Sequence, residues 1–130
     1  GISAGYMHSH SINSHTIIEN HPQIITKAQE WASRKSNVTI ITGSWYDVKA
    51  SLLTYDGLFY DTFGDRDMDK FSSSLSSLVK EGAKVTWWNN KPSETNFYNI
   101  PNVTYQTLNV SPPTNHYFNS NKYYLPKKEF

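Results

Sequence analysis

The stretch HTIIENHPQIITKAQEWASRKSNVTIIT (residues 15–42) carries two short apolar runs on either side of a helical pattern. The runs at 15–19 and 37–42 are rich in Ile, Val and Thr, which favour β-strands. Apolar residues recur between them at helical spacing, namely Ile24, Ile25, Ala28, Trp31 and Ala32. Pro22 precedes them and suits a first helical turn. A strand, a helix and a strand in this order predict a parallel pair joined by a crossover helix.

The next part of the chain repeats this order. The runs YDGLFYD and KVTWWN predict strands at 55–61 and 83–88. A helix is predicted between them, with an apolar face formed by Met68, Phe71, Leu75, Leu78 and Val79. Gly82 is expected to end this helix. The near-continuous apolar strands predict an α/β fold with a mostly parallel sheet that is buried on both faces.

The C-terminal part is different, because no helical pattern separates its two β-rich runs, NVTYQTLNV and NSNKYYLP. These runs predict an antiparallel pair near 102–109 and 117–125, at the edge of the parallel sheet. The connection that precedes them, residues 89–101, is polar and has no helical pattern. The chain opens with GISAGYMHSH, which predicts a helix with no strand before it.

Composition excludes several functional classes. The 130 residues suit one domain, residues 1–130. Lys and Arg number 12 against 11 Asp and Glu, so neither nucleic acid nor an anionic membrane is an expected partner. No apolar run is long enough to cross a membrane, and no secretory signal opens the chain. Since cysteine is absent, disulfides and thiolate metal sites are excluded. We therefore expect a soluble, cytoplasmic protein.

Polar residues follow three successive predicted strands. Glu19 ends the first, Gly43, Ser44 and Trp45 follow the second, and Asp61 ends the third. In open parallel sheets, ligands bind beyond the carboxyl ends of the strands. A carboxylate offers two oxygens to the two hydroxyls of a ribose, and an aromatic ring can stack on adenine.

Each of these residues also has a structural interpretation. Glu19 could be an exposed loop acid, Trp45 could pack at the edge of the sheet, and Asp61 could cap the following helix. Three such features at three successive strand ends favour one ligand cleft over three unrelated structural roles.

Two other groups of residues bear on function. His8, His10, His15 and His21 lie close in sequence, but His8 and His10 diverge on a helix, so no metal site is predicted. The pair Trp87 and Trp88 points to opposite faces of a strand. One of the two rings is expected in the core and the other at a cleft or an interface.

Several motifs together resemble the guanidinoacetate N-methyltransferase family and the related δ-N protein arginine N-methyltransferases. In that family an I-I-E strand end, a Q-x-W-A helix, a G-x-W-x-[DE]-V turn and a Y-D-T-[YF] strand end occur in this order, as they do within 14–65. The opening GISA looks like the continuation of the family's cofactor loop, and VSPPTNHYFNSNKYYLP is similar to its closing segment. The likeness covers residues 1 to about 126.

The resemblance implies a Rossmann-like N-methyltransferase that uses S-adenosylmethionine. Its acceptor would be a guanidino-type or other small amine. The cofactor would be bound by Gly1, Ile2, Glu19, Asn20, Gly43, Ser44 and Trp45. The acceptor would be bound by Asp61, Thr62 and Phe63, with Asp61 as the catalytic residue that orients the nitrogen and accepts its proton. The alternative is a catalytically inactive relative that serves as a ligand- or protein-binding module.

The chain departs from the family in three places. The first strand and first glycines of the cofactor loop are missing, as is the family's N-terminal segment with its second acid. The connection at 89–101 also lacks the family's helix. We expect that a further N-terminal segment or another copy fills the place of the first strand, between the strands at 15–19 and 55–61. The exposed sheet edge would then allow homo-oligomers to form.

Overall fold

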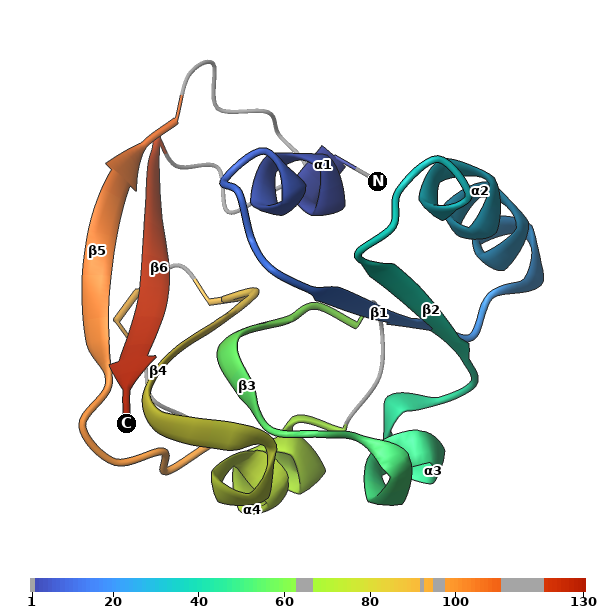
Figure 1. The fold of residues 1–130 in the computed structure, drawn as a ribbon. Coiled ribbons are helices and arrows are strands. Elements are labelled where there is room, and N and C mark those ends of the chain that lie inside the picture. Colours follow the sequence, from blue (N-terminus) through green and yellow to red (C-terminus); the bar gives the residue numbers. More distant parts are fainter. Residues whose placement is uncertain (1, 63–66, 92, 95–97, 111–120) are drawn as a thin grey trace. The chain divides into compact units, whose positions relative to one another are not determined.

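A computed structural model describes residues 2–62, 67–91, 93–94, 98–110 and 121–130. The chain forms two compact units, Gly1–Leu52 and Leu53–Phe130, here called the N-terminal unit and the C-terminal unit. The expectation of a single domain over residues 1–130 stays a prediction. Figure 1 shows the elements of each unit.

The N-terminal unit holds a two-stranded parallel sheet. Its elements are α1 (Ile2–His8), β1 (His15–Glu19), α2 (Pro22–Ala32), β2 (Val38–Thr42), α3 (Trp45–Val48) and the 3-10 helix η1 (Lys49–Ser51). The ladder runs in register from His15 opposite Val38 to Glu19 opposite Thr42. Pro22 opens α2, as predicted, because its missing N–H would have no partner in a first turn. The predicted strand–helix–strand order is confirmed here.

The C-terminal unit holds a four-stranded mixed sheet in the order β3-β4-β6-β5. Its elements are β3 (Tyr55–Tyr60), α4 (Met68–Leu78), β4 (Val79–Trp87), β5 (Thr104–Asn109) and β6 (Lys122–Glu129). β3 and β4 are parallel, whereas β6 is antiparallel to both β4 and β5. The predicted antiparallel pair at the edge of the parallel strands is therefore confirmed (Figure 1).

The last strand continues further than predicted. β6 runs to Glu129, past Pro126, where the prediction stopped at 125; residues 117–120 of that prediction lie outside the described residues. Pro126 lacks an N–H, but its carbonyl accepts a hydrogen bond from the Thr86 hydroxyl at 2.7 Å. Pairing with β4 on one side and β5 on the other therefore carries the strand through the proline.

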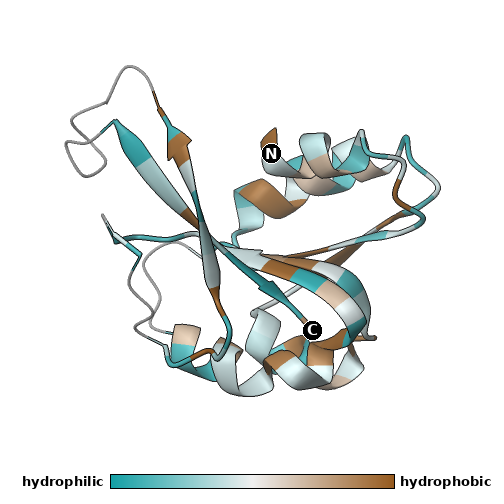
Figure 2. Ribbon diagram, turned by 90° about the vertical axis from the view of Figure 1, so that its left-hand side faces the viewer, coloured by the Kyte–Doolittle hydropathy of each residue, from teal (hydrophilic) through white to brown (hydrophobic). Residues whose placement is uncertain are grey.

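The buried core lies in the C-terminal unit. One face of α4 supplies buried Met68, Phe71, Leu75 and Leu78, as its periodicity predicted. The sheet supplies Val79, Ala83, Val85 and Trp87 from β4. The Phe71 ring stacks on Tyr60 of β3 with 4.2 Å between ring centroids, which joins helix and sheet. Hydrophobic residues are interspersed with hydrophilic ones along these elements (Figure 2).

The predicted role of Gly82 is wrong. α4 ends at Leu78 and β4 begins at Val79, which pairs with Tyr55 of β3. Gly82 lies inside β4 at φ +78°, and its N–H donates to the carbonyl of Phe130 at 2.7 Å. Strand pairing on both sides of this segment overrides the helical period that Val79 continues.

The strands at 15–19 and 55–61 do not pair directly, since β1 belongs to the two-stranded sheet and β3 to the four-stranded one. The expected strand between them stays a prediction. The described part of residues 89–101 has no helix, as expected from its sequence.

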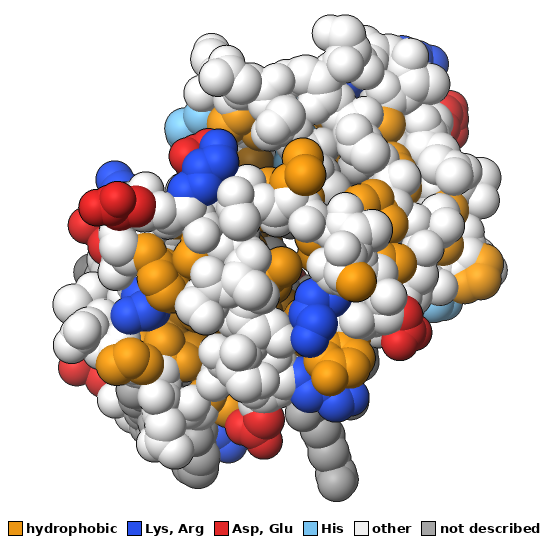
Figure 3. All heavy atoms as spheres, turned by 60° about the horizontal axis from the view of Figure 1, so that its bottom comes forward, with side chains coloured by type: hydrophobic (Ala, Val, Ile, Leu, Met, Phe, Trp, Pro, Cys, Tyr) orange, Lys and Arg blue, Asp and Glu red, His pale blue; other side chains and the backbone are white. Residues whose placement is uncertain are grey.

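Among the described residues, no helix is both long and apolar enough to cross a membrane. On the face drawn in Figure 3, basic and acidic side chains are interspersed, with hydrophobic side chains between them.

Candidate functional site

The three predicted site positions lie where the sequence placed them, at the carboxyl ends of strands. Glu19 is the last residue of β1, the turn at 43–45 follows β2, and Asp61 follows β3 directly. The first two belong to the N-terminal unit and Asp61 belongs to the C-terminal unit. The candidate residues of each unit are therefore described separately.

The Glu19 carboxylate is held in place by the backbone that follows it. Its Oε1 accepts hydrogen bonds from the N–H groups of Asn20 and His21, both at 2.9 Å. Oε2 makes no hydrogen bond to any residue that the structure describes. Glu19 is half-buried, so the alternative that it is an exposed loop acid is wrong. Its hydrogen bonds also order the turn before α2. One carboxylate oxygen fixes the group and the other is available to a ligand.

Gly43 joins the ends of the two strands. Its N–H donates to the carbonyl of Glu19 at 2.9 Å, and its φ is +134°. A Cβ at this position would lie 3.3 Å from Val48 Cγ1 of α3, so a side chain would be both strained and crowded. The turn beside Glu19 therefore requires glycine.

Ser44 and Trp45 begin a short helix that the sequence analysis did not predict. Ser44 is the N-cap residue of α3, without a side-chain capping bond, and Trp45 is its first residue. The half-buried Trp45 ring meets Tyr46 edge-on, with 5.5 Å between ring centroids. Four residues are too few to show a helical period; the signal that the sequence does carry is Ser44 followed by Asp47, a pattern typical of a helix start.

The remaining predicted site residues are exposed or lie outside the described residues. Ile2 begins α1 and is 83% exposed, and both Asn20 and Thr62 are exposed. Gly1 and Phe63 lie outside the described residues.

Asp61 does not cap any helix that the structure describes. The next described helix, α4, begins at Met68, and its N-cap residue is Asp67. Asp61 itself is exposed. The capping interpretation of Asp61 is therefore wrong, and its carboxylate faces solvent where β3 ends.

An aromatic pair lies next to the end of β3. The N–H of Trp88 donates to the carbonyl of Tyr60 at 2.9 Å, which fixes Trp88 beside the residue that precedes Asp61. The Trp88 ring stacks on Tyr123 of β6, with 4.9 Å between centroids and 24° between planes. As predicted, the two tryptophans differ: Trp87 is buried at 4% exposure and Trp88 is 42% exposed. Tyr123 was not predicted from the sequence, because it is 35 positions away from its partner.

Asn89 holds this aromatic pair through hydrogen bonds. Its backbone N–H donates to the Tyr123 hydroxyl at 2.8 Å, and its buried side-chain amide donates to the carbonyl of Tyr124 at 2.9 Å. Burial raises the pKa of Tyr123 above its usual value, the Asn89 hydrogen bond opposes that rise, and the charge of Asp61 adds to it. Asp61 is thus close enough to Tyr123 to act on it electrostatically.

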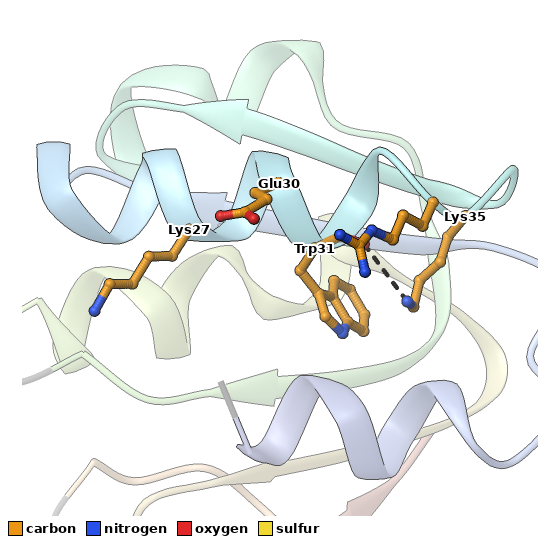
Figure 4. A pocket seen from close by; sticks show the side chains of 5 residues that line it. Lys27, Glu30, Trp31 and Lys35 are labelled. Carbon is orange, nitrogen blue, oxygen red and sulfur yellow. Dashed lines mark hydrogen bonds between the residues drawn. The ribbon is translucent and has the colours of Figure 1, made fainter.

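A separate hollow lies along α2, away from the strand ends (Figure 4). It is lined by Lys27, Glu30, Trp31, Arg34 and Lys35. Lys35 Nζ lies 4.3 Å from the centroid of the Trp31 ring. The same indole is approached edge-on by His8 and His15, at 5.5 and 6.2 Å between ring centroids.

The histidines form no metal site in the part of the chain that the structure describes, where no group of three or more His, Asp or Glu is placed to hold an ion. Burial lowers the pKa of His15, and the neighbouring His8 lowers it further.

A family model and several known proteins match part of this chain. The model of a family described as guanidinoacetate N-methyltransferase matches residues 1–88. A relative from Aspergillus oryzae named protein arginine N-methyltransferase 2 is 32% identical over 98 residues, covering 68% of this chain and 24% of the relative. The protein of the same name from Yarrowia lipolytica is 35% identical over 97 residues, covering 68% of this chain and 20% of the relative.

A third protein with this name, from Saccharomyces cerevisiae, is 32% identical over 75 residues, covering 53% of this chain and 18% of the relative. The chain thus spans about a quarter or less of the length of these relatives. All three are named as methyltransferases, so they give no support to the alternative of an inactive binding module.

Proposed function

Because the family model matches residues 1–88, the chain belongs to the guanidinoacetate N-methyltransferase family, and from this premise we propose that it binds S-adenosylmethionine for methyl transfer to a guanidino nitrogen. When bound, S-adenosylmethionine supplies an electrophilic methyl group on a sulfonium centre. A small amine is the second acceptor class that we consider.

The Glu19 carboxylate carries this proposal. Two backbone N–H groups hold its Oε1, and its Oε2 has no hydrogen bond among the described residues. A carboxylate in this state accepts hydroxyl donors without first giving up an internal bond. Glu19 would therefore bind the ribose hydroxyls of the cofactor.

The turn after β2 fits the adenine end of the same cofactor. Gly43 is tied to the Glu19 carbonyl, so Ser44 and Trp45 follow directly from the point where the ribose would lie. The backbone at Gly43 has no side chain to keep a ligand away, and the Trp45 indole offers a flat apolar ring. These residues account for the nucleoside half of the cofactor; Gly1 and Ile2 stay a proposal for the methionine half.

Asp61 would serve the acceptor. A guanidino group is a cation that donates N–H bonds to a carboxylate in bidentate geometry. In the transfer, a bond forms between the acceptor nitrogen and the methyl carbon while the bond from that carbon to sulfur breaks. Asp61 would orient the nitrogen and accept the proton that it loses. Its exposed position at the end of β3 leaves it accessible to an incoming acceptor.

Titration calorimetry of the chain with S-adenosylhomocysteine tests the proposal. We expect binding in the wild type and a roughly 10- to 100-fold weaker Kd in Glu19→Gln, because the change removes charge-assisted hydrogen bonds. Glutamine keeps an oxygen for the N–H groups of Asn20 and His21, so the turn should stay folded. Glu30→Gln, a change on α2 of the same unit, is the matched control and should bind like the wild type. Equal binding by all three proteins would refute the role of Glu19.

A further inference from the structure

The hollow along α2 has no role in the function proposed so far, and all of its lining residues belong to the N-terminal unit (Figure 4). Its volume is about 290 Å³, near the lower limit of small-molecule sites. Among the described residues that line it, Lys27, Arg34 and Lys35 are cations and Glu30 is an acid. The hollow therefore carries a local excess of positive charge, although the chain as a whole is nearly balanced.

Helical backbone brings these charges together. Lys27 and Glu30 lie about one turn apart on α2, and Arg34 comes directly after the C-cap residue, Ser33. Ser33 keeps helical angles, φ −58° and ψ −21°, and its N–H donates to the carbonyl of Gln29 at 2.9 Å. The helical direction therefore continues to Arg34, which lies four residues after Glu30.

Lys35 and Trp31 form a fixed wall of the hollow. Lys35 Nζ donates to the carbonyl of Trp31 at 3.5 Å and lies 4.3 Å from the centroid of its ring, which His8 and His15 contact edge-on. Capping of the helix end accounts for this position of Lys35, but it does not account for Lys27, which lies inside α2. The ammonium of Lys35 has two further N–H donors. It is thus held in place before a ligand binds, which lowers the cost of ordering it.

The protein does not neutralise these cations. No carboxylate in the described part of the chain forms an ion pair with Lys27, Arg34 or Lys35. Glu30 lies three residues after Lys27 and four before Arg34, at spacings that allow helical ion pairs, yet it pairs with neither. A negatively charged ligand would therefore meet three cations without breaking an internal ion pair.

Charge and shape together favour a dianion as the ligand. Three cations against one carboxylate leave two net positive charges, which match the charge of a phosphate monoester above its second pKa. The guanidinium fork of Arg34 can bind two phosphate oxygens, while an ammonium acts as a point charge on the others. A carboxylate or a phosphodiester carries one charge only and would leave half of this excess in place.

We propose that the hollow formed by Lys27, Trp31, Arg34 and Lys35 binds a phosphate dianion, either a phosphate monoester carried by another molecule or inorganic phosphate. The site goes beyond the proposed methyl transfer, since none of its lining residues belongs to the residues proposed for the cofactor or the acceptor.

Titration with methyl phosphate at about pH 7.5 and constant ionic strength tests this site, because the monoester then carries close to two charges. Binding is followed through the backbone amide signals of residues 27–35 in nitrogen-15 NMR spectra. Dimethyl phosphate is the matched ligand control, since it keeps the tetrahedral shape and carries one charge. We expect these signals to shift with methyl phosphate and to respond much more weakly to dimethyl phosphate.

A third titration, with inorganic phosphate, distinguishes the two sources of the dianion. Binding of either dianion supports the site, and the tighter of the two identifies the source. The absence of shifts in 27–35 with both dianions, or equal affinity for dimethyl phosphate, would overturn the proposal.

Variants separate this site from general electrostatic attraction. Lys27→Gln and Arg34→Gln should each weaken the affinity for the dianion by about 2- to 5-fold, the range of exposed charge pairs. Glu30→Gln should strengthen it by a similar factor, because it removes a repelling charge. Lys49→Gln, which changes a lysine of the same unit outside the hollow, is the matched control and should bind like the wild type. An equal loss in Lys49→Gln and Lys27→Gln would refute a specific site.

Calorimetry with S-adenosylhomocysteine distinguishes this proposal from the proposed function. Lys27→Gln should keep the affinity of the wild type for S-adenosylhomocysteine while it loses affinity for the dianion, and Glu19→Gln should do the reverse. If Glu19→Gln changed the affinity for the dianion and Lys27→Gln did not, the dianion would bind at the proposed cofactor site and the inference would be wrong. Thermal unfolding of each variant verifies its fold.

Discussion

The two units of the chain differ in how completely they bury their apolar residues. All fully buried apolar side chains among the described residues belong to the C-terminal unit, where Phe71 of α4 stacks on Tyr60 of β3. In the N-terminal unit, none of the described residues of α1, α2, β1 or β2 is fully buried. A two-stranded sheet has little apolar surface to share with its helices, and such sheets are marginal alone. The expectation that all parallel strands are buried on both faces is therefore wrong for β1 and β2.

The residues proposed for the cofactor and those proposed for the acceptor belong to different units. The N-terminal unit holds the carboxylate and the glycine turn proposed for the nucleoside, built largely from backbone hydrogen bonds. The C-terminal unit holds Asp61, proposed for the acceptor, at the end of β3. Cofactor binding and acceptor binding should consequently respond to different substitutions, and the stability of the two units should differ as well.

The largest expected effect is on methyl transfer. Asp61→Asn should leave the Kd of S-adenosylhomocysteine unchanged and lower the transfer rate to a guanidino acceptor by about 10²- to 10⁴-fold, because the amide cannot accept the proton. Rates are measured with a radiolabelled methyl donor. Asp69→Asn, an exposed acid in the first turn of α4, is the control. Undiminished turnover in Asp61→Asn would end the catalytic assignment of Asp61.

The next prediction compares the stability of the two units. Phe71→Ala should lower the free energy of unfolding by about 3–5 kcal/mol, because Phe71 is 1% exposed and its ring stacks on Tyr60. Ile40→Ala in half-buried β2 should lower it by only about 1–2 kcal/mol. Urea denaturation followed by circular dichroism measures both. If Ile40→Ala proved as damaging as Phe71→Ala, the contrast in burial between the units would not govern stability.

Particular residues show how far the sequence alone could reach. The strands and α4 followed from periodicity, since apolar spacing reports which side chains face the core. The strand-end positions of Glu19 and Asp61 followed from those strands. The position of Gly82 inside a strand could not be predicted in this way, because strand pairing on both sides determines it. The contact of Trp88 with Tyr123 could not be predicted either. Pairing between distant segments leaves no local pattern in the sequence.

Two glycines with positive φ sharpen the comparison further. Gly43→Ala should destabilise the chain by about 2–3 kcal/mol, because the new Cβ adds a 3.3 Å contact with Val48 Cγ1 to the backbone strain. Gly82→Ala in β4 should lose about 1 kcal/mol, since its φ is +78° but nothing lies within 4 Å of the added Cβ. Thermal unfolding gives the order of the two. A greater loss of stability in Gly82→Ala would mean that the contact of the added Cβ with Val48 does not determine the cost of Gly43→Ala.

The smallest expected effect is a pH dependence confined to the N-terminal unit. Burial, with a smaller contribution from His8, lowers the pKa of His15 below its ordinary value of 6.5 in the folded chain. Below about pH 6.5 the unfolded chain therefore takes up a proton that the folded chain resists, so stability falls as the pH decreases toward the folded pKa.

Urea unfolding at about pH 7.5 and 5.5 measures this loss of stability. His15→Gln should reduce the pH dependence, because it removes the titrating group. His10→Gln, at an exposed position, should keep it. An unchanged pH dependence in His15→Gln would show that the acid sensitivity arises elsewhere. Hydrogen exchange shows where the protonation of His15 acts. If the loss of stability at low pH depends on His15, faster exchange in β1 and β2 but not in β3 and β4 would show that it is confined to the less buried N-terminal unit.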